Sequence, residues 1–187
     1  MSKVRLYLVR HGKTMFNTIG RAQGWSDTPL TAEGELGIHE LGIGLRESGL
    51  QFDRAYSSDS GRTIQTMGII LEELGLQGKI PYRMDKRIRE WCFGSFDGAY
   101  DGDLFMGLIP RIFNVDHVHQ LSYAELAEGL VEVDTAGWAE GWEKLSGRIK
   151  EGFEAIAKEM EEQGGGNALV VSHGMTIGTI VYLINGM

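Results

Sequence analysis

The chain contains the stretch Ala168-Leu169-Val170-Val171-Ser172-His173-Gly174-Met175-Thr176, and Leu8-Val9-Arg10-His11-Gly12-Lys13-Thr14 repeats its pattern. In each copy an apolar run rich in β-branched residues ends in one polar residue and a His-Gly pair. Such a run, closed by a turn residue, predicts a buried strand that feeds a loop. The carboxyl ends of parallel strands lie along one sheet edge, where ligands bind. We therefore expect His11 and His173 to face one another at that edge.

Segments with strand and helix patterns alternate around these two runs. Further strands are expected at residues 53–57 and 79–83, and helices from Thr31, after Ser58 or Ser60, and over 138–160 and 175–184. This alternation predicts an α/β fold, a three-layer α/β/α sandwich with a mostly parallel central sheet. Residues 95–137 are irregular, with short apolar pieces that suggest helices, and we expect a small helical cap there. Residues 1–187 are thus predicted to form a single domain with a cap insertion.

Composition excludes several classes of protein. The net charge of −8 disfavours non-specific binding to nucleic acid or to an anionic membrane. The single cysteine, Cys92, allows neither an intramolecular disulfide nor a cysteine-rich metal site. No apolar run has the length of a signal peptide core or a membrane span, so we expect a cytoplasmic protein. Nothing in the sequence indicates an oligomeric state.

Two arginines accompany the two histidines. Arg10 ends the first strand, and Arg62 lies in the first turn of the helix after the second strand, where a cation is unfavourable unless an anion is bound nearby. Together they suggest a phosphate clamp. Neither His-Gly motif contains the carboxylates that hold Mg²⁺, so the pattern favours phosphoryl transfer without a metal. A neutral imidazole is a competent nucleophile, and the leaving oxygen then needs a proton from a carboxyl group.

The chain resembles the histidine phosphatase superfamily, which includes the cofactor-dependent phosphoglycerate mutases and the fructose-2,6-bisphosphatases. The resemblance spans nearly the whole chain, and the motifs come in the family's order. They are Leu8–Thr14, Asn17, Gln23-Gly24, Asp27, Pro29–Thr31, Gly34, Tyr56–Asp59, Arg62-Thr63, Thr66, Arg89-Glu90, Phe93-Gly94, Phe96–Gly98 and Val171–Gly174.

The resemblance implies a phosphohistidine mechanism with no metal and no other cofactor. Its nucleophile is His11, and its general acid is Glu90, whose pKa the neighbouring Trp91 and Phe93 are expected to raise. The positions that bind phosphate or substrate are Arg10, Asn17, Gln23, Gly24, Arg62, His173 and Gly174.

The substrate class follows from departures within the resemblance. Residues 91–98 are nearer the phosphatase branch than the mutase branch, and the cap lacks the Arg-rich stretch with which mutases grip a bisphosphate. The residues of the cap that could bind an anionic group are few, namely Arg111, His117 and His119. We therefore expect a phosphatase acting on a small phosphorylated metabolite. Family members also continue past the last motif, so the resemblance implies a chain that is short or truncated at its C-terminal end.

Three alternatives stay open. A phosphoglycerate mutase would use the same site with a bisphosphoglycerate primer. A phosphate-binding regulatory pseudoenzyme would need neither nucleophile nor acid. A metal-dependent hydrolase would use histidines as ligands, and His117 and His119 have a suitable spacing but no evident third ligand.

Overall fold

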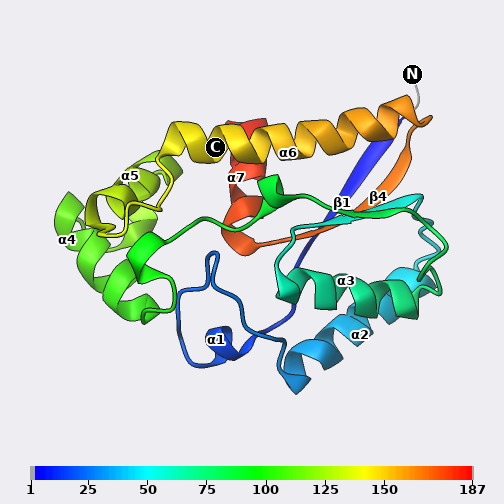
Figure 1. Ribbon diagram of the computed structural model, residues 1–187, viewed down its shortest axis with the longest axis horizontal. Helices are drawn as coiled ribbons and strands as arrows, with labels where there is room; N and C mark the ends of the chain where they lie inside the picture. The colour runs from blue at the N-terminus through cyan, green and yellow to red at the C-terminus, as the bar shows by residue number, and fades with distance from the viewer. Residues whose placement is uncertain (1–2, 187) are drawn as a thin grey trace.

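The computed structural model describes residues 3–186, in which four strands form one parallel sheet of order β1-β4-β2-β3 (Figure 1). The strands are β1 (Val4–Arg10), β2 (Arg54–Ser57), β3 (Tyr82–Met84) and β4 (Gly166–Ser172). Arg10 pairs with Ser172, so β1 and β4 end at the same level. The two His-Gly pairs therefore leave the sheet side by side.

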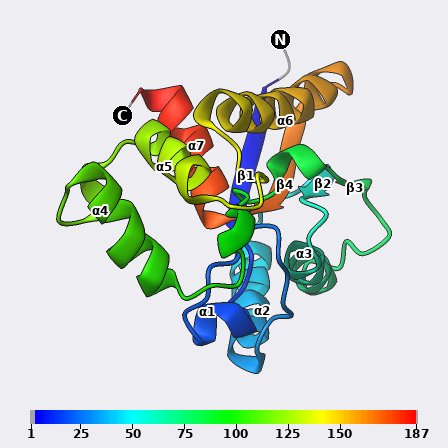
Figure 2. The same ribbon diagram turned by 60° about the vertical axis from the view of Figure 1, so that its left-hand side comes forward.

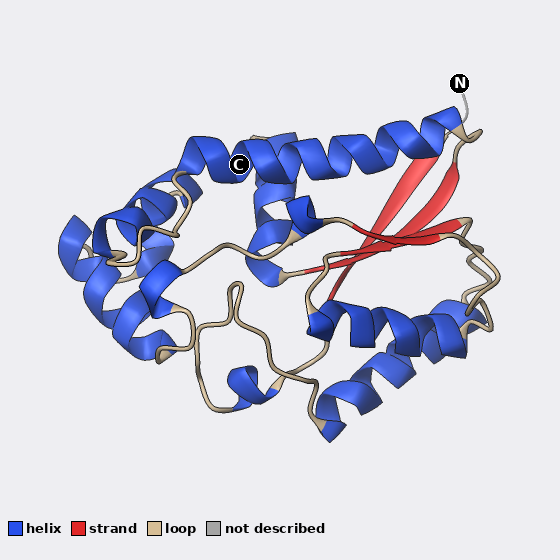
Figure 3. Cartoon of the chain, in the orientation of Figure 1, coloured by secondary structure: helices blue, strands red, loops and turns tan. Residues whose placement is uncertain are grey.

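Helices cover both faces of the sheet, which confirms the three-layer α/β/α sandwich (Figure 3). Helices α2 and α3 pack on the face that carries Leu169 and Val171, and α6 and α7 pack on the face that carries Ala168 and Val170. Successive residues of a strand point to opposite faces, so the continuous apolar run of β4 serves both layers. The helices are α1 (Met15–Thr18), α2 (Ala32–Glu47), α3 (Gly61–Glu73), α4 (Ile109–Phe113), α5 (Tyr123–Val133), α6 (Trp142–Glu162) and α7 (Gly174–Asn185).

The glycines of α2 are only partly explained by packing. Thr31 caps the helix as predicted, accepting a hydrogen bond from the Gly34 backbone. A Cβ at Gly34 would lie 2.1 Å from the Lys13 carbonyl oxygen, and one at Gly42 would lie 2.6 Å from the Cβ of Glu73. A Cβ at Gly37 would meet nothing within 4 Å. Close approach therefore requires glycine at Gly34 and Gly42 but not at Gly37.

The long helix begins later than its apolar stripe predicts. We expected it to start at Trp138, but α6 starts at Trp142 and Trp138 is 69% exposed. The carboxylate of Asp134 accepts hydrogen bonds from four backbone N–H groups, those of Ser95, Ala136, Trp138 and Ala139. These bonds hold the chain in a turn, so the residues before Trp142 are not helical.

The cap lies beside the end of the sheet toward which β1 and β4 run (Figure 2). It contains α4 and α5, as its two apolar pieces predict, together with three short segments, η2 (Gly94–Phe96), η3 (Gly102–Leu108) and η4 (Val118–Gln120). Segment η3 is π-helical, a conformation that often occurs at functional sites. Within residues 3–186, no helix combines the length and the apolarity that crossing a bilayer requires.

Candidate active site

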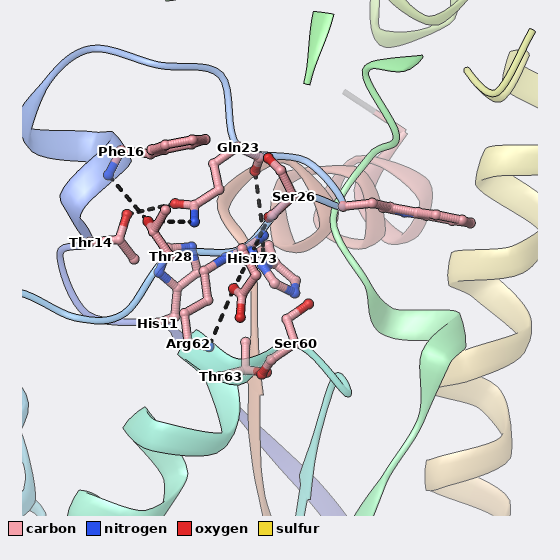
Figure 4. A network of polar contacts seen from close by, with 12 residues as sticks. His11, Thr14, Phe16, Gln23, Ser26, Thr28, Ser60, Arg62, Thr63 and His173 are labelled. Carbon is pink, nitrogen blue, oxygen red and sulfur yellow. Dashed lines mark hydrogen bonds and ion pairs between the residues drawn. The ribbon is translucent and has the colours of Figure 1, made fainter. Parts of the chain in front are cut away.

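His11 and His173 meet at the sheet edge, as expected. Their ring centroids lie 5.3 Å apart, with an interplanar angle of 62°. Figure 4 shows them with Arg62 in one network of polar contacts. The network connects the ends of β1 and β4 to the start of α3, so three segments far apart in the sequence build it.

The surroundings of His11 fix its tautomer. Its Nδ1 lies 2.8 Å from the Gly12 carbonyl oxygen, which can only accept, so Nδ1 carries the proton and Nε2 keeps its lone pair. Burial, followed by the charges of Arg62 and Arg10, lowers the pKa of His11 to about 4. The ring is therefore neutral near pH 7, which is the state that a nucleophile needs.

Arg62 is fully buried and holds the loop formed by residues 23–27. One guanidinium nitrogen, Nη1, donates to the Ser26 carbonyl and to the Asp27 carboxylate at 2.8 Å. The other, Nη2, donates to the Gly24 carbonyl at 2.8 Å and to Nδ1 of His173 at 3.0 Å. Its Nε is buried without a hydrogen-bond partner among the described residues. Arg62 is not among the residues that line the cavity in front of His11, so the structure does not show the phosphate contact that the sequence predicts for it.

His173 has partners on both ring nitrogens. Since Nδ1 accepts from Arg62, the proton is on Nε2, which donates to Ser58 Oγ at 2.7 Å. Burial and the charge of Arg62 hold the pKa of His173 well below its usual value. The resemblance implies a direct phosphate contact by this residue, but the structure places it behind His11 with both nitrogens engaged. The reason is that Arg62 and Ser58 supply a matching donor and acceptor.

A cavity of about 430 Å³ opens in front of His11. Arg10 is exposed in it, and no hydrogen bond or ion pair to its guanidinium occurs within residues 3–186, so this cation is free to bind an anion. The lining residues are Arg10, His11, Asn17, Arg21, Gln23, Glu90, Phe93, Asp101, Phe105, Met106, Gly174 and Met175.

Glu90 is a buried carboxyl group on the wall of this cavity. Its Oε1 accepts from the backbone of Trp91 and from the backbone and hydroxyl of Thr176. Among the described residues, its Oε2 accepts a hydrogen bond from the backbone of Met175 alone, at 3.1 Å. Burial raises the pKa of Glu90, outweighing these hydrogen bonds. The less occupied Oε2 is the atom that can carry a proton.

The other predicted binding residues divide into two groups. Asn17, Gln23 and Gly174 line the cavity. Gly24 does not: its carbonyl supports Arg62, and a Cβ there would lie 2.3 Å from the Trp91 carbonyl oxygen. The structure therefore does not show the predicted substrate contact of Gly24, whose carbonyl instead accepts a hydrogen bond from Arg62.

The sequence assigned no role to several residues near the cavity, although Asp97 lies in one of the family motifs. Asp97 accepts hydrogen bonds from the backbone of Gly24, Ser26 and Phe93, and so holds the loop of residues 23–27. Arg21 and Asp101 line the cavity and carry charge. Arg21 lies between the motif positions Asn17 and Gln23, and this place in the sequence could have indicated that it lines the site. Asp101 lies in the irregular cap, where no periodicity marks it.

The cap histidines do not join the site. His117 precedes η4, and His119 lines a second hollow. Within residues 3–186 no three His, Cys, Asp or Glu side chains gather in a group that could hold a metal ion.

Comparison with known proteins shows the family to which the chain belongs. Residues 6–187 match the model of the histidine phosphatase superfamily (branch 1). The chain belongs to this superfamily. It is 32% identical over 186 residues to a protein named "Probable phosphoglycerate mutase GpmB" from Salmonella choleraesuis (strain SC-B67), covering 98% of this chain and 76% of the relative.

Solved structures of the same superfamily share the fold. A phosphoglycerate mutase from Bacillus anthracis str. Sterne superposes with a TM-score of 0.92 at 36% identity, covering 99% of this chain and 82% of the other. The protein YhfR from Bacillus stearothermophilus superposes with a TM-score of 0.72 at 26% identity, covering 97% and 80%. The superfamily contains both phosphatases and mutases, so the fold alone does not distinguish the two reactions.

Proposed function

We propose that the protein hydrolyses phosphomonoesters of small metabolites through a phosphohistidine at His11, with no metal ion taking part. The observation that carries this proposal is the state of His11, a neutral ring whose unprotonated Nε2 lies at a cavity that also holds Arg10 and Glu90. Phosphate binding alone would need neither a free imidazole lone pair nor a buried acid.

The reaction has two steps in this site. In the first, Nε2 of His11 attacks phosphorus, the bond to the ester oxygen breaks, and Glu90 gives its proton to that oxygen. In the second, Glu90 takes a proton from water, the water oxygen attacks phosphorus, and the bond between phosphorus and Nε2 of His11 breaks, which releases inorganic phosphate and restores the neutral imidazole. Arg10, which lines the cavity, stabilises the charge on the phosphoryl oxygens in both transition states, and the buried guanidinium of Arg62 adds its positive charge from behind His11. His173 acts through Arg62, whose guanidinium it helps to position.

Hydrolysis is favoured over mutase chemistry by the cavity wall. A mutase must hold a second anionic group of phosphoglycerate, and Arg21 is the one lining cation besides Arg10 among the described residues. Arg21 stacks on Tyr100 and donates to the Gly98 carbonyl, so it is already engaged. The cap contributes Asp101, Phe105 and Met106 to the wall of this cavity, and none of them is a cation. The names of the relatives make phosphoglycerate mutase the second candidate.

One assay separates these possibilities. The protein is incubated with p-nitrophenyl phosphate and with 3-phosphoglycerate, each with and without EDTA, and released phosphate and isomerised phosphoglycerate are measured. Phosphate release that survives EDTA supports the proposal. Isomerisation exceeding release, after priming with bisphosphoglycerate, indicates a mutase. Activity that EDTA removes and added metal restores contradicts the metal-free mechanism, and binding without turnover indicates a regulatory protein.

A further inference from the structure

A second hollow adjoins the catalytic cavity. It has a volume of about 850 Å³, and we call it the cap pocket. It is lined by Phe105, Met106, Val118, His119, Leu121, Ser122, Tyr123, Leu126, Met175 and Tyr182. These residues come from the cap and from α7. A pocket of this size, mostly apolar and aromatic, is typical of a small-molecule site.

The two hollows share part of their walls. Phe105, Met106 and Met175 line both the cap pocket and the catalytic cavity. Phe105 and Met106 are neighbours in the π-helical segment η3, and Met175 lies in the first turn of α7. A ligand whose phosphate lies against His11 can therefore extend past these three side chains into the cap pocket.

The position of the acid indicates which part of a substrate extends there. Glu90 has to reach the leaving oxygen, and its Oε2 accepts a hydrogen bond from the backbone of Met175. Met175 is also a wall of the cap pocket. The leaving oxygen is therefore placed at the entrance to the cap pocket, and the carbon skeleton attached to it lies inside.

The chemistry of the cap pocket restricts that skeleton. Within residues 3–186, no Lys, Arg, Asp or Glu side chain lines the cap pocket, and the hydroxyl of Ser122 already donates to Glu125. His119 is its one imidazole. A carboxylate or a second phosphate would find no fixed positive charge there, whereas apolar groups are favoured. A cavity of about 150 Å³ holds benzene, so an aromatic ring or an alkyl chain fits easily.

We propose that the physiological substrate is a phosphomonoester of a bulky, largely apolar alcohol, whose ring or chain occupies the cap pocket. This inference rests on the proposed phosphatase activity and adds the class of leaving group. It also explains why η3 presents Phe105 and Met106 together at the junction of the two hollows.

The test is a series of primary alkyl phosphates from methyl to hexyl, since the longer members have leaving groups of similar basicity. We expect kcat/KM to rise by about fourfold for each methylene that enters the pocket. In Leu126→Trp, which fills the pocket, we expect the ratio of hexyl to methyl phosphate activity to fall at least tenfold. Leu36→Trp, at an exposed position on α2, is the matched control and should keep the wild-type ratio.

The outcomes separate the two proposals. A steep wild-type series that flattens in Leu126→Trp supports the inference. A flat wild-type series, with glycerate phosphates hydrolysed as well as hexyl phosphate, overturns it while the phosphatase proposal survives. If no phosphomonoester is hydrolysed, both fail. The wild-type series decides even if Leu126→Trp does not fold, and Leu126→Ala then serves as the second variant.

Discussion

The guanidinium of Arg62 donates a hydrogen bond to Nδ1 of His173 over 3.0 Å, deep behind the nucleophilic histidine. Arginine does not lose its proton in proteins, so this contact keeps His173 neutral with its remaining proton on Nε2. It also ties the loop of residues 23–27 to the end of β4, because the same guanidinium holds the carbonyls of Gly24 and Ser26. Arg62 thus holds the structure of the site together and also places a positive charge there, whereas Arg10 contributes only its positive charge.

The two arginines should therefore respond differently to removal. Arg62→Ala leaves Asp27, two carbonyls and His173 without their donor, and we expect a loss of about 3–5 kcal/mol in the free energy of unfolding. Arg10→Ala should change it by no more than about 0.5 kcal/mol, because Arg10 is exposed. Its kcat/KM should nevertheless fall by roughly 10²–10³. Urea unfolding measures the stability of the two variants, and steady-state kinetics measure their kcat/KM. If Arg10→Ala destabilised the protein as much as Arg62→Ala, Arg10 would have a structural partner.

The pH profile should report His11 and Glu90. His11 must be neutral to attack, so kcat/KM should fall as the pH drops through its lowered pKa of about 4. Glu90 must be protonated, so kcat/KM should also fall as the pH rises through the raised pKa of that carboxyl group. The measured profile is corrected for the second ionisation of the phosphate group of the substrate, which has a pKa of about 6. In Glu90→Gln the alkaline fall should disappear; if it persists, another group is the acid.

The same variant should be sensitive to the leaving group. A p-nitrophenolate departs without a proton, whereas an alkoxide does not. Glu90→Gln should therefore lower kcat by about 10²–10⁴ for an alkyl phosphate and much less for p-nitrophenyl phosphate. Glu162→Gln, at the exposed end of α6, is a matched control. Equal losses on both substrates would mean that Glu90 positions α7 without donating a proton.

Two glycines of α2 provide a test of the fold. Gly34→Ala places a methyl group 2.1 Å from the Lys13 carbonyl oxygen, and we expect it to destabilise the protein by about 1–3 kcal/mol. Gly37→Ala meets nothing within 4 Å and should stabilise it by about 0.5–1 kcal/mol through helix propensity. Thermal unfolding of both variants measures the difference. A similar effect in both would contradict the close approach of α2 to the His11 loop.

Much of this architecture could be predicted from the sequence because local patterns determine it. The apolar runs that end at Arg10 and Ser172 specified two strands, and their His-Gly pairs specified the edge at which the site lies. Only β4 is buried as predicted, whereas β1 is half-buried because it lies at the edge of the sheet. The start of α6 was wrong by one turn because the capture of four backbone N–H groups by Asp134 is a tertiary event. Trp138 continues the apolar stripe of α6, so the periodicity of the sequence gives no sign that the helix begins after it.

The inner arrangement of the site was harder to predict for a similar reason. The two histidines were correctly brought together, but the hydrogen-bond partners of His173 come from Ser58 and Arg62, which are over 100 residues away in the chain. The role of Gly24 depends on the distance to Trp91, which no local pattern contains. The cap residues that shape the cavity lie in an irregular segment, where neither helical nor strand periodicity predicts which side chains turn inward.

The proposed mechanism requires that Nε2 of His11 becomes phosphorylated during turnover. This step is open to a direct experiment. It is tested most directly by mixing the protein with an excess of aryl phosphate, quenching within the first turnovers under alkaline conditions, and locating the phosphoryl group by mass spectrometry. We expect an acid-labile, alkali-stable phosphohistidine at His11, absent from His11→Ala and present in His39→Ala, whose imidazole lies on α2 beside Glu73. Turnover with no phosphoenzyme, or a phosphoryl group found on another residue, would contradict it.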